Sequence, residues 1–201
     1  MIKPNWPAPP NVFALTTTRE GGVSQGPYES LNLGLHVGDD PAAVAINRAR
    51  LGVHLPEAPR WLDQVHGTEV VDAAQLTGTV QADAAFTREP GVVCAVMTAD
   101  CLPILLCDQQ GHVVAAAHAG WRGLHAGVIE ATVAAMATPA DRLLAWIGPA
   151  IGQAAFEVGE EVREAFLATH PDDAAHFAPH REGKWRADLA GLARARLLRL
   201  G

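Results

Sequence analysis

The fold of this chain is decided by the segment GVVCAVMTADCLPILLCDQQGHVVAAAHAG (91–120). Three short apolar runs, at 91–99, 101–108 and 111–119, make up most of it, and polar or turn-forming residues separate them. Such runs are typical of strands that are buried on both faces. The sequence QQG at 109–111 suits the turn of a hairpin between the second and third runs. We therefore predict that this segment forms the buried centre of a β-sheet.

The regions on either side of this segment carry both helical and extended patterns. NVFALTTT (11–18) predicts a strand, and the glycine-rich stretch 19–40 predicts a long ordered loop. An aspartate, Asp39 or Asp40, followed by Pro41 indicates the start of a helix over 41–51. Apolar spacing also predicts helices over 124–137, 160–170 and 187–200, and a strand over 141–148. This mixture indicates an α/β or α+β fold.

The composition limits the classes of function. A length of 201 residues and a hydrophobic content of 49% suit one domain, residues 1–201, with a buried core. The formal net charge of -7 disfavours a protein that binds nucleic acid through a basic surface. No apolar run approaches the roughly 20 residues that a bilayer-spanning helix needs. We expect neither nucleic acid nor a membrane as a partner.

The cysteines and the first residues bear on the cellular compartment. Cys94, Cys101 and Cys107 form an odd set, which suits a reducing compartment better than a disulfide framework. Cys94 and Cys107 lie within apolar runs, where cysteine usually serves for packing. The start MIKPNWPAPP lacks the apolar stretch of a secretory signal. We expect a cytoplasmic protein.

Three reactive side chains lie among small or polar neighbours, in DQVHG (63–67), TADCLP (98–103) and AAHAGWRG (116–123). They are His66, Cys101 and His118, which are widely spaced, whereas the ligands of zinc fingers come in close pairs. Two imidazoles and one thiolate from separate elements match a catalytic zinc site with a fourth position open. Taken singly, each residue also suits an ordinary loop or core position, so spacing alone leaves both interpretations open.

Several longer strings of the sequence are similar to those of a known family. They are TTTREGGVSQGPYESLNLGLHVGDD (16–40), WLDQVHGTEV (61–70), ADAAFT (82–87), TADCLPILL (98–106), AAHAGWRGL (116–124) and IGPAIG (147–152). In order and spacing the chain resembles the bacterial laccase-domain or "polyphenol oxidase" family, whose members are also described as multifunctional purine nucleoside phosphorylases. The resemblance implies that His66, Cys101 and His118 bind zinc, with copper a less favoured alternative.

The resemblance also has implications for architecture. It implies a single α+β domain of mixed β-sheets flanked by helices, a sandwich in the group with cysteine-hydrolase architecture. Similar proteins continue beyond Gly201, so we expect the C-terminal segment of the family to be absent from this chain.

Further residues are candidates for catalysis or substrate binding. Asp100, beside the expected thiolate, could orient a metal-bound histidine or act as a general base, although in a strand it would point away from Cys101. Guanidinium groups match phosphate and ribose oxygens, and an aromatic ring can stack on a purine. Arg122 precedes a predicted helix, whose N-terminus favours an anion, but it also suits an exposed turn. The substrate-binding candidates are Arg19, Tyr28, Asn32, His36, Arg48 and Arg122.

Three functions compete. The leading hypothesis is a zinc-dependent enzyme in which phosphate attacks the anomeric carbon of adenosine, inosine or methylthioadenosine, with adenosine deamination as a further activity. Its partners would be a small nucleoside and phosphate. The second is a cysteine hydrolase that acts on peptidoglycan precursors through Cys101 and His118. The third is a zinc-stabilised binding module without turnover. Copper-dependent laccase activity is not expected, because multicopper oxidation needs several more histidine ligands.

Overall fold

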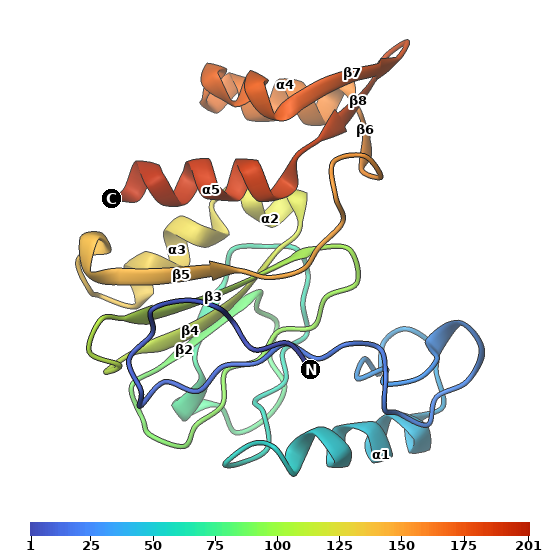
Figure 1. The fold of residues 1–201 in the computed structure, drawn as a ribbon, viewed down its shortest axis with the longest axis vertical. Coiled ribbons are helices and arrows are strands. Elements are labelled where there is room, and N and C mark those ends of the chain that lie inside the picture. Colours follow the sequence, from blue (N-terminus) through green and yellow to red (C-terminus); the bar gives the residue numbers. More distant parts are fainter.

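The computed structural model describes all residues from 1 to 201, and a five-stranded mixed sheet lies at its centre (Figure 1). The strands are β1 (Val70–Asp72), β2 (Ala84–Thr87), β3 (Leu102–Asp108), β4 (Val114–Ala119) and β5 (Leu143–Ile147), in the order β1-β2-β4-β3-β5. Strands β1 and β2 are parallel, and all other neighbours are antiparallel. The predicted strand over 141–148 is therefore confirmed as β5.

The hairpin predicted at 109–111 is confirmed, because it joins β3 to β4. Nearly every residue of these two strands is buried, which explains why their sequences are apolar on both faces. Gly111 has a φ of 72° at the turn, a conformation that glycine adopts without steric cost. The carboxylate of Asp108 accepts hydrogen bonds from the backbone N–H groups of His112 and Val113 and so closes the turn.

Helices cover one face of the main sheet. They are α2 (Trp121–Ala126) and α3 (Val128–Ala135), with α5 (Leu189–Leu200) packed on α3 and β5. The prediction of one helix over 124–137 was wrong, because Gly127 has a φ of 102° and separates α2 from α3. A glycine in the left-handed conformation is a common way for a helix to end. The helix predicted over 187–200 is confirmed as α5.

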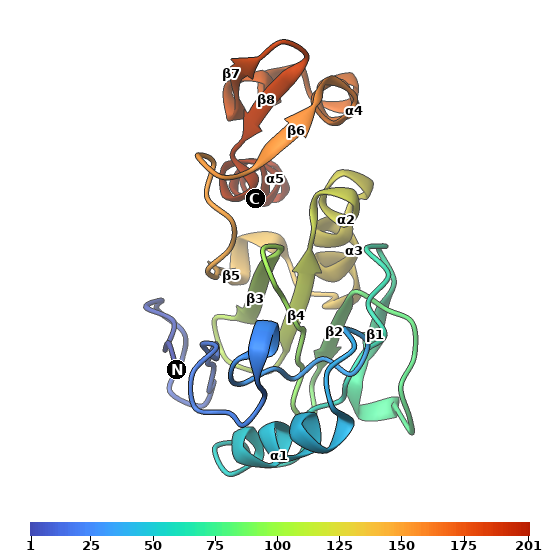
Figure 2. The same ribbon diagram turned by 90° about the vertical axis from the view of Figure 1, so that its right-hand side faces the viewer.

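A second, antiparallel sheet lies beyond α5, at the end of the molecule farthest from α1 (Figures 1 and 2). It has the strand order β6-β8-β7, and it packs with α4 (Glu160–Thr169), which confirms the helix predicted over 160–170. Its strands are β6 (Glu157–Gly159), β7 (Phe177–Arg181) and β8 (Lys184–Ala187). One core cluster contains buried side chains of the main sheet together with Phe166 of α4 and Phe177 of β7. The fold class is α+β, with mixed sheets flanked by helices.

Two predicted strands, at 11–18 and 91–99, are wrong. Within the first, only Thr16 forms a bridge, to Ile2, and within the second only Cys94 does, to Arg60. Val92, Cys94 and Val96 instead pack against a small second core of Leu62, Ala73, Ala82 and Ala85. The apolar pattern therefore reflects burial of these side chains and not the pairing of strands, because strand propensity largely measures how well a side chain fits a half-buried surface.

The helix predicted over 41–51 is confirmed as α1 (Pro41–Gly52). The Asp40 carboxylate accepts a hydrogen bond from the Ala42 N–H, and Pro41 occupies the first turn. Short 3-10 helices occur at Gly26–Tyr28, Ala73–Gln75, Ala140–Arg142 and Pro171–His176. None of the helices has both the length and the apolar character needed to cross a membrane.

Candidate metal centre

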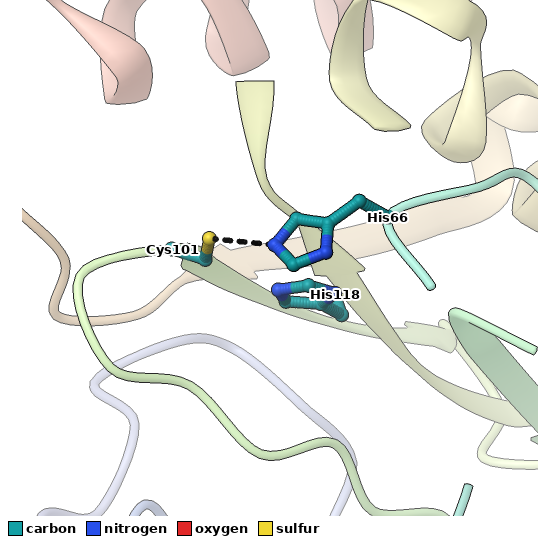
Figure 3. Close-up of side chains that lie close together, drawn as sticks. All are labelled: His66, Cys101 and His118. Atoms are coloured by element: carbon teal, nitrogen blue, oxygen red, sulfur yellow. Dashed lines mark hydrogen bonds between the residues drawn. The ribbon is translucent and has the colours of Figure 1, made fainter. Parts of the chain in front are cut away.

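The side chains of His66, Cys101 and His118 come together at one end of the main sheet (Figure 3). Their potential ligand atoms all lie within 4.8 Å of one another, and Cys101 Sγ is 3.7 Å from His66 Nε2. Cys101 directly precedes β3, His118 belongs to the neighbouring strand β4, and His66 lies in the loop before β1. The strand register explains why Cys101 and His118 lie close together, since Pro103, two residues after Cys101, is paired with His118.

Two glycines of the GWRG motif permit the close approach of the ligand loops. A Cβ atom on Gly120 would lie 2.7 Å from His66 Cδ2 and 2.9 Å from Cys101 Sγ. A Cβ atom on Gly123 would lie 2.8 Å from the carbonyl oxygen of Gly67. The start of α2 can therefore pack against the His66 loop only because neither position carries a side chain.

Burial and nearby charges shift the pKa values of two of the ligands, His118 and Cys101. Burial lowers the pKa of His118, against the opposing effect of Asp83, so this imidazole is neutral at neutral pH. Burial raises the pKa of the Cys101 thiol, and the negative charges of Asp100 and Asp83 raise it further. Without a cation this thiol stays protonated, and a bound cation would favour the thiolate.

The donor set fits a transition metal. Two imidazole nitrogens and one sulfur converge, and no further histidine, cysteine or carboxylate joins the group. Zinc in catalytic sites commonly has three protein ligands and one open position, as this arrangement would provide. A set of two histidines and one cysteine also accepts copper. The site is therefore a candidate metal centre with an accessible face.

A cavity of about 1130 Å³ adjoins the three ligands, and 26 of its 50 lining residues are hydrophobic. Val114, Ala115, Ala116 and His118 of β4 are among its lining residues. The glycine-rich loop and the segment 87–99 supply much of the remaining wall. Its volume is more than sufficient for a small organic substrate.

Four of the six predicted substrate-binding residues, Arg19, Tyr28, Asn32 and His36, line this cavity. The Tyr28 hydroxyl donates a hydrogen bond to the carbonyl oxygen of Val37 at 2.7 Å. Asn32 Nδ2 donates to Asp39 Oδ2 at 2.9 Å, and Arg19 Nε donates to the Glu29 carbonyl at 2.6 Å. The loop thus holds these side chains at the cavity wall.

The two remaining substrate-binding candidates, Arg48 and Arg122, do not line the cavity, and neither does the catalytic candidate Asp100. The Arg48 guanidinium lies 4.1 Å from the centroid of the Trp61 ring, and its Nε donates to the Leu33 carbonyl. Arg122 lies over Trp121. Asp100 precedes β3 and has a φ of 74°, so the alternation of a strand does not determine where it points. Substrate contact by Arg48 and Arg122, and a catalytic role for Asp100, stay predictions.

Two structural residues near the ligands escaped the sequence analysis. Asp83 is fully buried, and its carboxylate contacts the backbone of the His66 loop and the ring of His118. Gln64 makes two hydrogen bonds to the backbone of Met97, at 2.7 and 2.8 Å, and so ties the His66 loop to the segment before Cys101. Asp83 stands in the ADAAFT string, where an acidic residue directly before an apolar strand was the available signal.

A third such residue, Asn47, organises the glycine-rich loop from α1. It is fully buried, and its amide accepts from the Val23 N–H and donates to Ser24 Oγ and to the carbonyls of Ser30 and Asn32. A polar residue at helical spacing between Val44 and Leu51, on the buried face of the helix, was the signal that could have identified it.

Similar proteins are known from several bacteria. The chain is 57% identical over 197 residues to "Purine nucleoside phosphorylase PA4543" of Pseudomonas aeruginosa, and the aligned region covers 98% of this chain and 81% of that protein. It is 54% identical over 207 residues to "Purine nucleoside phosphorylase YfiH" of Escherichia coli, which covers 100% of this chain and 84% of that protein.

Solved structures give the same picture. Neisseria meningitidis protein NMB0706 superposes with a TM-score of 0.96 at 53% identity, over 100% of this chain and 83% of that one. YlmD from Geobacillus stearothermophilus superposes with a TM-score of 0.83 at 34% identity, over 92% of this chain and 75% of that one. The family model described as multi-copper polyphenol oxidoreductase laccase matches residues 13–201. With that match over nearly all of its length, the chain belongs to the polyphenol oxidoreductase laccase family.

Proposed function

We propose that the protein is a zinc-dependent purine nucleoside phosphorylase. The observation that carries this proposal is the group of His66, Cys101 and His118, with room for one more ligand, beside a cavity of about 1130 Å³. The names of the similar proteins from Pseudomonas aeruginosa and Escherichia coli support this reaction class. The ligands we propose are a purine nucleoside and phosphate.

The proposed reaction is phosphorolysis of adenosine, inosine or methylthioadenosine. A phosphate oxygen forms a bond to the anomeric carbon while the glycosidic bond breaks, and the purine leaves with the bonding electrons and takes up a proton. In the proposed complex Tyr28 stacks on the purine, and the guanidinium of Arg19, of which only Nε is paired with the protein, contacts phosphate or ribose. Asn32 and His36 lie on the same wall. A zinc ion held by the three ligands would supply a Lewis acid.

Adenosine deamination is a second proposed activity of the same site. Water replaces the exocyclic amino group of adenosine, which yields inosine and ammonia. The cavity would bind adenosine in both reactions, so the presence of phosphate would decide which products accumulate. We place this activity second because it rests on the metal donor set alone.

The alternatives fit the site less well. A cysteine nucleophile is usually activated by a lowered pKa, whereas burial raises the pKa of Cys101. The hydrogen-bond partner of its sulfur is His66, and not His118 as the hydrolase hypothesis requires. Multicopper oxidation needs several metal sites, but only one group of three ligands is present. An activity assay with nucleoside and phosphate distinguishes an enzyme from a binding module, which would show no turnover.

The test combines metal analysis with product analysis. Protein purified without chelator should contain about one zinc ion per chain, since one donor set is present. With phosphate and adenosine or inosine it should release the free base and ribose 1-phosphate. Cys101→Ala should lose both metal and activity while circular dichroism shows a folded chain.

Three results would contradict the proposal. Copper at the same stoichiometry would overturn zinc as the metal. Full zinc content without turnover of any of the three nucleosides would favour the binding module. Activity retained by metal-free Cys101→Ala would show that the ligand group does not take part.

A further inference from the structure

The carboxylate of Asp83 contacts both histidines of the metal centre. Its Oδ1 accepts hydrogen bonds from His118 Nδ1 at 2.8 Å and from the backbone N–H of His66 at 2.9 Å. Its Oδ2 accepts from the backbone N–H groups of Val65 at 3.2 Å and Gly67 at 2.6 Å. Asp83 is fully buried, so water does not compete for these four contacts.

For His118 the contact fixes the tautomer. An ionised carboxylate only accepts hydrogen bonds, so Nδ1 must carry the proton. In a neutral imidazole the other nitrogen, Nε2, then has a free lone pair. The register of β4 fixes the same residue from the backbone, because the His118 N–H donates to the Asp83 carbonyl at 2.7 Å. Its ring is 4.7 Å from that of His66, centroid to centroid, on the side where the ligands meet (Figure 3).

For His66 the contact fixes the backbone. His66 has a φ of 61°, which is unfavourable for a residue other than glycine and persists only where the surroundings impose it. Three consecutive N–H groups converge on the Asp83 carboxylate, so the carboxylate holds this turn. This backbone conformation directs the ring of His66 toward Cys101 Sγ.

We propose that Asp83 is a positioning residue that couples the two histidine ligands and prepares the donor set before a metal binds. One oxygen, Oδ1, serves both the His118 ring and the His66 backbone, so a change at this atom displaces two ligands at once. The inference rests on the metal site of the proposed function. It does not depend on which nucleoside reacts.

The isosteric variant Asp83→Asn tests the coupling. With its oxygen in the Oδ1 position, the asparagine would face the N–H groups of Val65 and Gly67 with its own NH₂ group. With its oxygen in the Oδ2 position, the NH₂ group would face the His66 N–H and would drive His118 to the tautomer whose Nε2 carries a proton. Each orientation keeps two of the four hydrogen bonds, so the ligand group is disturbed in either case.

The matched control is Asp108→Asn. Asp108 is also a buried carboxylate that accepts two backbone N–H groups, but at the far end of β3 from the metal centre. Titration with Co²⁺ and competition for Zn²⁺ should show metal affinity reduced roughly 10- to 100-fold in Asp83→Asn and unchanged in Asp108→Asn. The thiolate-to-cobalt absorption should persist at saturation, because Cys101 remains. Equal affinities of Asp83→Asn and wild type would overturn the proposal.

A measurement on the wild type covers the case in which Asp83→Asn fails to fold. Long-range ¹H–¹⁵N correlation spectra of the metal-free protein at neutral pH should show His118 with its proton on Nδ1. A proton on Nε2 would overturn the proposal. A wild type that binds neither ion would instead overturn the metal site of the proposed function. Metal binding without phosphorolysis would overturn that function and leave the role of Asp83 intact.

Discussion

Gly120 shows how one missing side chain permits the metal centre. A methyl group there would lie under 3.0 Å from both His66 and Cys101, and the ligand atoms would have to move apart. We expect Gly120→Ala to keep its fold but to lose most of its bound metal, measured as metal per chain. Gly152→Ala is the control, because a Cβ atom at that position would meet nothing within 4 Å. Full metal content in Gly120→Ala would show that the ligands tolerate the displacement.

Arg48 offers a second test at this scale. Its guanidinium stacks on Trp61, a cavity residue, and its Nε holds the Leu33 carbonyl, so it supports the loop that carries four candidate residues. We expect Arg48→Ala to keep its zinc and its fold while kcat/KM for nucleoside falls. The expected fall corresponds to a loss of about 1.5–3 kcal/mol of transition-state stabilisation. Arg48→Lys should rescue poorly, because an ammonium cannot replace a planar guanidinium on an aromatic ring. Unchanged steady-state kinetics in both variants would show that the contacts of Arg48 with Trp61 and Leu33 do not affect turnover.

Sequence patterns identified some of these residues better than others. His66, Cys101 and His118 could be predicted because their chemistry and their motifs agree, and the structure brings them within 4.8 Å of one another. Asp83 was missed, because an acidic residue before an apolar strand does not by itself show that its carboxylate faces the amides of the His66 loop. Such contacts depend on tertiary structure, and local patterns do not encode them.

At the scale of elements, α1 and the glycine-rich loop form one unit through Asn47. Replacing this buried amide with alanine leaves the Val23 N–H and the Asn32 carbonyl without their partner, whereas the Ser30 carbonyl keeps the hydrogen bond from the Ser24 N–H. We expect Asn47→Ala to lower the free energy of unfolding by about 2–4 kcal/mol, since each unpaired buried group costs about 1–3 kcal/mol and water can relieve part of this. Urea unfolding measures the loss.

Ile46→Ala is the control for Asn47→Ala, because Ile46 lies in the same helix with half of its surface exposed. We expect its free energy of unfolding to change by less than about 1 kcal/mol. Similar losses in the two variants would indicate that the Asn47 network contributes little.

The elements also show where local patterns stop being informative. The helices α1, α4 and α5, strand β5 and the β3–β4 hairpin follow from caps, periodicity and turn residues. The stretches 11–18 and 91–99 have the composition of strands but lack a neighbouring strand, and they line the cavity instead. Pairing is a property of two segments, so a single apolar run cannot establish it.

For the whole molecule, the buried thiols predict how stability depends on pH. Burial raises the pKa of Cys94 to about 12, with Asp72 as a smaller cause, and that of Cys107 to about 11, with a smaller contribution from Asp108. The ordinary value is 9.0, so above that pH the unfolded chain releases protons that the folded chain retains. The contribution of the two protonated thiols to the stability of the folded chain is therefore complete below pH 9.0, and it is lost as the pH rises through about 11 to 12.

We expect the free energy of unfolding of chelator-treated wild type to fall between about pH 7.5 and about pH 10.5, as measured by urea titration. In Cys94→Ala/Cys107→Ala this decrease should be smaller, although the variant starts from a lower stability because two core side chains are shortened. Cys101 is present in both proteins, so its titration cancels in the comparison. An equally steep decrease in the double variant would show that groups other than these two thiols control stability at high pH.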